Sequence, residues 1–202
     1  DQMIDTPTNN FATLNPLIPI VPTGSAPTIS EGNLKEVFAS SSWASGFTWV
    51  VESGKFYCEY LLVSNPDSQR LSLVGIISEN ENLGISNPQD RTKGLWYYAY
   101  DGGKRDGSTT TTYGAAYAPG DIVGIALDKD GDTLTFYKNG SSQGELDLTS
   151  YNVGTDSVYI GAACNDCTVV WNFGADSSFG GLKTSGSAAA QDSAGKGDFF
   201  YT

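Results

Sequence analysis

The residues that could carry out acid–base or nucleophilic chemistry in this chain are its carboxylates, serines and three cysteines, because the sequence contains no histidine. Without histidine, and without a G-x-S-x-G segment, a serine or cysteine nucleophile lacks its usual base. A glycosidase needs two carboxylates about 5 to 10 Å apart, whereas Glu59 is isolated and Glu79 and Glu81 lie in a polar stretch. We therefore predict no catalytic residues and no enzyme, a glycan-degrading activity being the weakest alternative.

An acidic cluster imitates the start of a calcium-binding loop. Asp128, Asp130 and Asp132 alternate along the chain as calcium ligands do. An EF-hand loop would next require Gly at Thr133 and Glu at Asn139, and neither is present. We interpret the cluster as a solvated hairpin turn, with weak calcium binding as the alternative, and we predict no metal site and no cofactor.

Two of the three cysteines have the C-x-x-C spacing of redox and zinc sites. Cys164 and Cys167 flank Asn165-Asp166, which predicts a final hairpin of strands Ser157 to Cys164 and Cys167 to Phe173. Zinc needs two further Cys or His ligands, and a redox motif belongs before a helix. We expect two reduced structural thiols, with a disulfide as the alternative.

The densest mixture of aromatic rings and both charge signs predicts a recognition site. In the strand Leu95 to Tyr100, alternate residues face opposite sides, so one set of rings must be core and the other could present rings, although we expect most of the rings in the core. The polar loops Glu79 to Lys93 and Asp101 to Arg105 flank this strand. Aromatic faces beside acids and amides are suited to sugars or peptides. The predicted ligand-binding residues are Asp90, Arg91, Tyr98, Tyr100, Asp101, Lys104, Arg105 and Tyr113.

The clearest structural element is the stretch Gly120 to Gly140. Its first half is apolar on both faces, as in a strand buried between layers, and its second half, TLTFY, alternates with Leu134 and Phe136 facing the core. In the turn between them, Gly131 is the residue suited to a positive φ. Asn139-Gly140 predicts a type I′ hairpin turn into a further strand.

Composition limits the class of protein and its partners. A chain of 202 residues with 24 glycines and no sustained helical period predicts one all-β domain. A net charge of −12 with only 11 Lys and Arg argues against nucleic acid. No apolar run approaches the ~18 residues of a membrane span, so we predict no membrane insertion. Because the chain starts at Asp1, we expect a segment of a longer or processed protein.

Several of these stretches resemble the SPRY domain family. The central signature, a GD-V-G-LD strand followed by an F-KNG hairpin, is matched by GDIVGIALD from Gly120 and LTFYKNG from Leu134. The later V-NFG element is matched by VVWNFG from Val169, and Lys55 to Ser64 with Leu71 to Ser78 resemble the GK-Y-E and VG strands. The resemblance covers roughly Gly54 to Gly181. It implies an antiparallel β-sandwich of concanavalin A-like jelly-roll type, without catalysis, that holds a peptide or other partner in loops at one edge.

The predicted organisation is an extended N-terminal arm or edge segment (1–32), the sandwich (33–182), and a small-residue linker with a C-terminal aromatic segment (183–202). We expect Phe11, Leu14 and Leu17 to pin the arm to a sheet, and the aromatics of Asp198 to Tyr201 to dock onto the body.

The partner is predicted from a second, shorter resemblance. DTPTNNFATLNP near the N-terminus is similar to the lead-in of SPRY-type modules in tailed-phage virion proteins of aquatic bacteria. The first hypothesis is therefore a homo-oligomeric virion protein, assembled in the host cytoplasm, that contacts other virion proteins and a host-surface glycan or protein, as in a tail fibre. The alternative is an intracellular protein-interaction module that binds a peptide.

Overall fold

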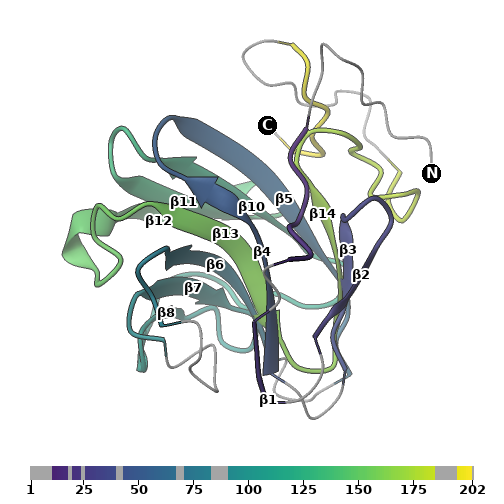
Figure 1. Cartoon of the computed structure of the whole chain (residues 1–202). Helices are drawn as coiled ribbons and strands as arrows, with labels where there is room; N and C mark the ends of the chain where they lie inside the picture. Colours follow the sequence, from purple (N-terminus) through teal and green to yellow (C-terminus); the bar gives the residue numbers. More distant parts are fainter. Residues whose placement is uncertain are drawn as a thin grey trace.

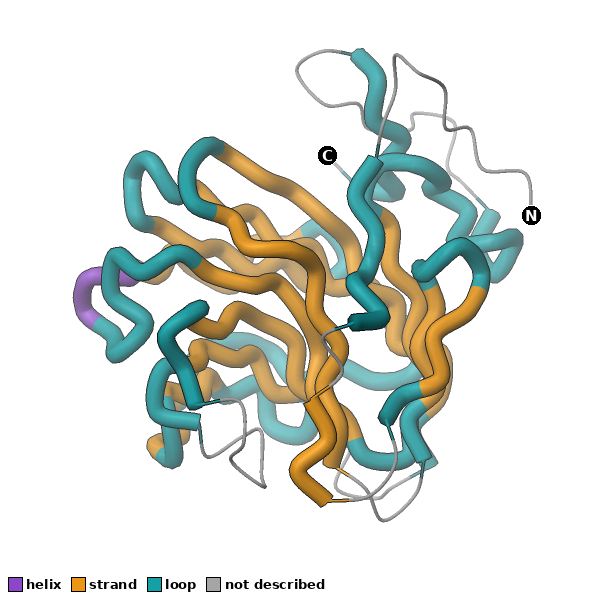
Figure 2. The backbone as a smooth tube through the Cα atoms, viewed as in Figure 1, coloured by secondary structure: helices purple, strands orange, loops and turns teal. Residues whose placement is uncertain are grey.

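The fold is a sandwich of two seven-stranded antiparallel sheets, as predicted. It is seen in a computed structural model (Figure 1), which describes residues 11–17, 20–23, 26–39, 43–66, 71–82, 91–184 and 195–201. Figure 2 shows strands joined by loops along the described chain and, in purple, the short 3-10 turn η2 (Leu148–Ser150). No helix among these residues is long and apolar enough to cross a membrane.

Strands distant in sequence are neighbours in both sheets. The first sheet has the order β1 (Ile20–Thr23), β4 (Trp43–Val51), β13 (Val158–Cys164), β6 (Ser72–Ser78), β7 (Gly94–Tyr98), β8 (Lys104–Asp106) and β9 (Thr109–Thr111). The second sheet has the order β12 (Ser141–Asp147), β11 (Thr133–Lys138), β10 (Ile122–Asp128), β5 (Lys55–Ser64), β14 (Thr168–Asn172), β3 (Lys35–Val37) and β2 (Thr28–Ser30).

The main core lies between the sheets and is built from the inward-facing residues of alternating strands. Its fully buried members include Leu62, Val74, Ile76, Leu95, Tyr97, Ile125, Phe136 and Val169. Two smaller apolar clusters lie on the outer faces, because the alternate residues of the same strands are also apolar. Leu73, Ile77, Trp96, Tyr98 and Ala163 form the cluster on the first sheet, and Leu61, Ile122, Val170 and Phe179 form the one on the second.

The β10–β11 hairpin confirms the two strands predicted for the stretch Gly120 to Gly140. The two strands pair from Val123↔Lys138 to Asp128↔Thr133, and Leu134 and Phe136 are fully buried as predicted. The turn between them differs in one detail. Its left-handed residue is Asp132, with a φ of 49°, rather than Gly131. An Asp tolerates this conformation because its short side chain bonds locally.

The Asn139-Gly140 turn is the predicted two-residue hairpin, with φ of 48° and 79° and Lys138 paired to Ser141. A Cβ at Gly140 would also lie 2.8 Å from the ring of Tyr201. We expect Gly140→Val to lower the melting temperature by several degrees, since a β-branched residue at positive φ costs about 1 to 3 kcal/mol. Thermal unfolding followed by circular dichroism measures this. An unchanged midpoint would contradict the turn assignment.

One predicted local pairing is wrong. Strands β13 and β14 do not form a hairpin, because β13 pairs with β4 and β6 in the first sheet and β14 pairs with β3 and β5 in the second. Likewise β5 and β6 lie in opposite sheets. Short links between consecutive strands can cross from one layer of a sandwich to the other, and alternation within a strand does not reveal the layer to which it belongs.

Both ends of the described chain lie on the sandwich. Strand β1 forms one edge of the first sheet and β2 forms one edge of the second. Leu14 is buried and its N–H bonds the carbonyl of Asn33, as expected of a pinned arm, whereas Leu17 is 89% exposed, so its predicted packing is wrong. At the other end Phe199 is buried, which confirms that C-terminal aromatics dock onto the body. Most of the predicted linker lies outside the described residues.

Candidate functional site

The structure buries two of the predicted ligand-binding side chains. Arg91 is 0% exposed and Tyr98 is 6% exposed, so the prediction that they contact a ligand from the surface is corrected. Tyr98 belongs to the apolar cluster on the outer face of the first sheet. Of the alternate set Trp96, Tyr98 and Tyr100, the first two rings are buried and Tyr100 is exposed. Asp90 lies outside the described residues.

The two predicted cations of β8 point to opposite sides of the sheet. The Arg105 guanidinium lies 5.1 Å from the ring centroid of Tyr98. The Lys104 ammonium lies 5.5 Å from the ring of Tyr113 and 5.9 Å from that of Tyr151. Neighbouring strand residues face opposite ways, so the structure does not bring these residues into one site.

The remaining predicted residues divide between structural and accessible roles. The Tyr113 hydroxyl donates to the carbonyl of Gly144, and its ring packs edge-on against Tyr97, so Tyr113 is mainly structural. Tyr100 is 50% exposed, and Asp101 is exposed while accepting the Gly103 N–H at 2.8 Å. Ligand contacts by Tyr100, Asp101, Lys104, Arg105 and Tyr113 stay a prediction.

The acidic turn uses its carboxylates within the fold. Asp128 accepts from Lys55 Nζ at 2.6 Å, Asp130 from the Gly54 N–H at 2.8 Å, and Asp132 from Lys129 Nζ at 2.7 Å. The Lys55 hydrogen bond lowers the pKa of Asp128. No group of three or more His, Cys, Asp or Glu side chains able to hold a metal is found within the described ranges. These observations support a turn held by ion pairs and backbone bonds.

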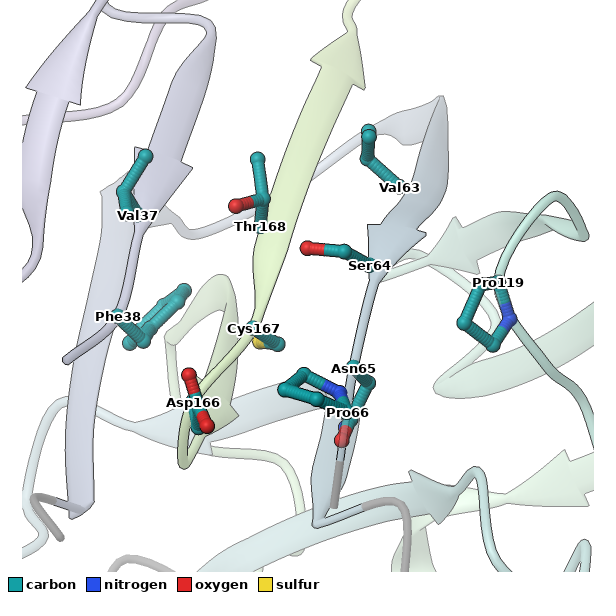
Figure 3. Close-up of a pocket in the computed structure, with 10 residues that line it drawn as sticks. All are labelled: Val37, Phe38, Val63, Ser64, Asn65, Pro66, Pro119, Asp166, Cys167 and Thr168. Atoms are coloured by element: carbon teal, nitrogen blue, oxygen red, sulfur yellow. The ribbon is translucent and has the colours of Figure 1, made fainter. Parts of the chain in front are cut away.

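A pocket opens at one end of the second sheet, where β3 and β5 end and β14 begins (Figure 3). Its volume is about 420 Å³. The pairing of β14 with β5 shifts between Thr168↔Ser64 and Val169↔Leu62, so Val63 is an extra residue in β5. Such a bulge bends a strand and re-aims its side chains. The lining residues are Val37, Phe38, Val63, Ser64, Asn65, Pro66, Pro119, Asp166, Cys167 and Thr168.

The pocket combines an apolar lining with a few polar groups. Valine, proline and phenylalanine side chains supply the apolar surface, and Val37 is 39% exposed there. Asp166 supplies the formal charge of the lining, and the hydroxyl and amide groups of Ser64, Asn65 and Thr168 supply hydrogen-bonding groups. Pockets of this composition bind an apolar group and orient it with a small number of polar contacts.

The predicted reduced thiols are a disulfide in the structure, Cys164–Cys167, and Cys167 also lines the pocket. The prediction failed because it assumed a hairpin. Instead Cys164 ends a strand of the first sheet, and Cys167 directly precedes a strand of the second, with Cα atoms 6.1 Å apart. The bond therefore links the two layers where the chain crosses between them. Cys58 is a buried free thiol.

Reduction of this disulfide should lower the free energy of unfolding by about 2 kcal/mol, the loop-entropy value for so short a ring. Urea unfolding with and without a phosphine reductant measures the change. A Cys164→Ala/Cys167→Ala double variant is the control, because its stability should not respond to the reductant. Equal stability of the oxidised and reduced wild type would contradict the expectation.

Sequence reasoning missed two buried carboxyl groups. Glu36 is fully buried, its Oε2 accepts from the Trp171 indole N–H at 2.8 Å, and burial raises its pKa to about 8. Glu59, read from the sequence as isolated, is also fully buried, and burial raises its pKa. Its hydrogen-bond donors include the backbone N–H groups of Phe200 and Tyr201. No local pattern could reveal these contacts, because Trp171, Phe200 and Tyr201 lie more than 100 residues from the carboxyl groups that they bond.

Comparison with known proteins agrees with this architecture. Among solved structures, the SPRY domain of human HERC1 superposes with a TM-score of 0.62 at 17% identity, covering 78% of this chain and 96% of that one. Another human SPRY domain gives 0.56 at 18% identity, covering 75% and 99%. Stonustoxin gives 0.58 at 17% identity, covering 80% of this chain but 27% of that one. At these identities the likeness shows the fold. The SPRY domain family model matches residues 63–176, more than half of the chain, and the chain therefore belongs to the SPRY domain family.

Proposed function

We propose that this SPRY domain is a non-catalytic recognition module that binds a protein partner through the pocket where β3 and β5 end and β14 begins. The observation that carries the proposal is the pocket itself, a hollow of about 420 Å³ with a mainly apolar lining. The family is one of protein-interaction modules, which supports a protein as the partner.

The chemistry of the lining defines the ligand more closely. Val37, Val63 and Pro119 offer contact to an apolar side chain of the partner. Asp166 and the carbonyl oxygen of Asn65 are acceptors, so a peptide with N–H groups or a cation beside its apolar residue is complementary to the pocket. Such a site takes one short segment of a protein, with the apolar residue as its anchor.

Binding of peptides selected from a random display library tests the proposal, with affinities measured by calorimetry. Val37→Glu should weaken binding at least about tenfold, equivalent to about 1.4 kcal/mol, because it places a charge beside the apolar lining. Leu182→Glu is the matched control, since Leu182 is similarly exposed and is not a lining residue. Affinity that is unaffected by Val37→Glu would place the peptide site elsewhere.

A second candidate, favoured by the N-terminal lead-in, is attachment of a tailed-phage virion to its host. In this reading several copies, assembled into a virion in the host cytoplasm, contact a host-surface glycan or protein through Tyr100 and the loop Asp101 to Arg105. Linked sites raise avidity by about 10² to 10⁴, so weak single sites are sufficient. Tail or baseplate genes beside its gene would support this setting.

Replacement of Asp101, Lys104 and Arg105 by Ala in a multimeric form tests the second candidate. Cell adsorption should fall while circular dichroism stays unchanged. A glycan array separates a glycan ligand from a protein ligand. Adsorption equal to that of the wild type would remove this loop from the site.

A further inference from the structure

The outer face of the second sheet already holds a short peptide segment, residues Asp198 to Tyr201 of the chain itself. Asp198 N–H donates to the carbonyl of Gly174 at 2.8 Å, and its own carbonyl accepts from Asn172 Nδ2 at 2.8 Å. The Asp198 carboxylate accepts from the backbone N–H and hydroxyl of Ser177, at 3.2 and 2.9 Å. These hydrogen bonds fix the position of Asp198, the first residue of the segment, relative to residues 172–177.

The backbone N–H groups of Phe200 and Tyr201 are bound by one buried carboxylate. Glu59 accepts the Phe200 N–H at Oε2 and the Tyr201 N–H at Oε1, each at 2.8 Å. Asn172 Nδ2 donates to Oε2 at 3.0 Å and the Tyr57 hydroxyl to Oε1 at 3.3 Å. Hydrogen bonds to an ionised acceptor are about twice as strong as neutral ones. Glu59 and Asn172 therefore bind the main chain of the segment through hydrogen bonds.

The side chains of the segment occupy apolar surface prepared by the body. The ring of Phe199 is buried and meets Tyr57 edge-on at 5.0 Å. Phe200 packs against the outer cluster that contains Phe179, at a centroid distance of 6.4 Å. Such aromatic pairs contribute about 0.5 to 1.5 kcal/mol beyond their burial. The body thus supplies both main-chain and side-chain contacts for an acidic–aromatic–aromatic sequence.

We propose that this face is a peptide-binding site, separate from the pocket, for a segment in which an acidic residue precedes two aromatic ones. In this structure the chain's own residues 198–201 occupy the site as a ligand in cis. A partner segment of the same chemistry binds there in trans when it displaces them. The groups that bind the segment belong to the sheet itself, because Glu59 lies in β5 and Asn172 in β14. Leaving the Glu59 carboxylate without its two N–H donors is costly, so displacement favours exchange of one peptide for another.

Because the chain's own segment occupies the site, a partner peptide needs a high affinity to displace it. A tethered segment has an effective concentration of the order of millimolar for a short linker. A free peptide therefore binds the intact protein weakly, because it competes with the tethered residues 198–201. It binds strongly only after the link between this segment and the body is cut. The site is regulated by its own C-terminal segment.

The test uses the full chain with a protease recognition site inserted between Ala189 and Ala190. After cleavage, a fluorescent peptide of residues 195–202, GKGDFFYT, is titrated and its anisotropy is measured. We expect saturable binding to the cleaved protein and at least about tenfold weaker binding to the intact protein. Glu59→Gln should weaken binding to the cleaved protein at least about tenfold, since it replaces the charged acceptor. Glu145→Gln, an exposed change on β12 of the same sheet, is the matched control.

A second peptide, GKGDAAYT, separates aromatic recognition from backbone recognition and should bind at least about tenfold more weakly than GKGDFFYT. Circular dichroism of each cleaved protein reports whether the body stays folded. A folded body that does not bind GKGDFFYT would overturn the proposal. Unfolding on cleavage would also overturn it, because the segment would then be part of the fold rather than an exchangeable ligand. Neither result bears on Val37 or the pocket.

Discussion

Gly75→Ala should leave little folded protein, because the centre of β6 has no room for a methyl group. Gly75 pairs with Gly161 of β13 and Trp96 of β7. An added Cβ would lie 2.1 Å from the carbonyl oxygen of Leu95 and 2.9 Å from the Cα of Trp96. Both atoms belong to the backbone of an interior strand and cannot move aside as a flexible side chain would. We expect a cost above about 4 kcal/mol, an exceptional value for one substitution, in a domain whose total stability is about 5 to 15 kcal/mol.

Urea unfolding and the yield of soluble protein measure this cost. Gly154→Ala is the matched control: nothing lies within 4 Å of its Cβ position, although its φ is 53°. The control should lose only about 1 to 2 kcal/mol, the cost of a left-handed conformation for alanine. If Gly75→Ala lost no more stability in urea than Gly154→Ala, the close contact between the backbones of β6 and β7 would be contradicted.

Glu36→Gln should remove a steep loss of stability with rising pH. Burial raises the pKa of Glu36 from 4.5 to about 8, although the Trp171 N–H partly opposes this. Between these two pH values the Glu36 carboxyl is protonated in the folded state and ionised in the unfolded state. Folding therefore takes up a proton. Stability therefore falls as pH rises from about 4.5 to about 8, by up to about 1.4 kcal/mol per pH unit. A glutamine is neutral throughout and contributes no such slope.

Urea unfolding of both proteins at pH 5, 6, 7 and 8 gives the contribution of Glu36 as the difference between two curves. Carboxyl groups whose pKa is lowered, such as Asp128 and Asp156, are common to both curves and cancel. The difference should grow with pH in favour of Glu36→Gln. Glu52→Gln, on an exposed residue, serves as the surface control. Parallel curves for Glu36→Gln and the wild type would mean that Glu36 has an ordinary pKa in the folded protein.

The sequence by itself determined the turns and the strand alternation of this protein, because both depend on residues that are neighbours in the chain. The Asn139-Gly140 turn follows from residues that tolerate positive φ, and the alternation of Leu134 and Phe136 follows from the two-residue period of a strand. Strand signals of this kind, together with the family motifs, were sufficient for the all-β sandwich and for the SPRY family.

The tertiary structure alone decided which strands share a sheet and which side chains meet. Period-two alternation is the same in either layer, so it could not show that β13 and β14 lie in opposite sheets or that Cys164 and Cys167 join them. It also could not show that Arg91 is buried, or that Tyr98 is buried in a cluster on the outer face of the first sheet. Glu59 is isolated in the sequence, yet its partners arrive from residues 172, 200 and 201. Burial and hydrogen bonding between distant segments depend on the packing of the whole chain, and local residue patterns do not record them.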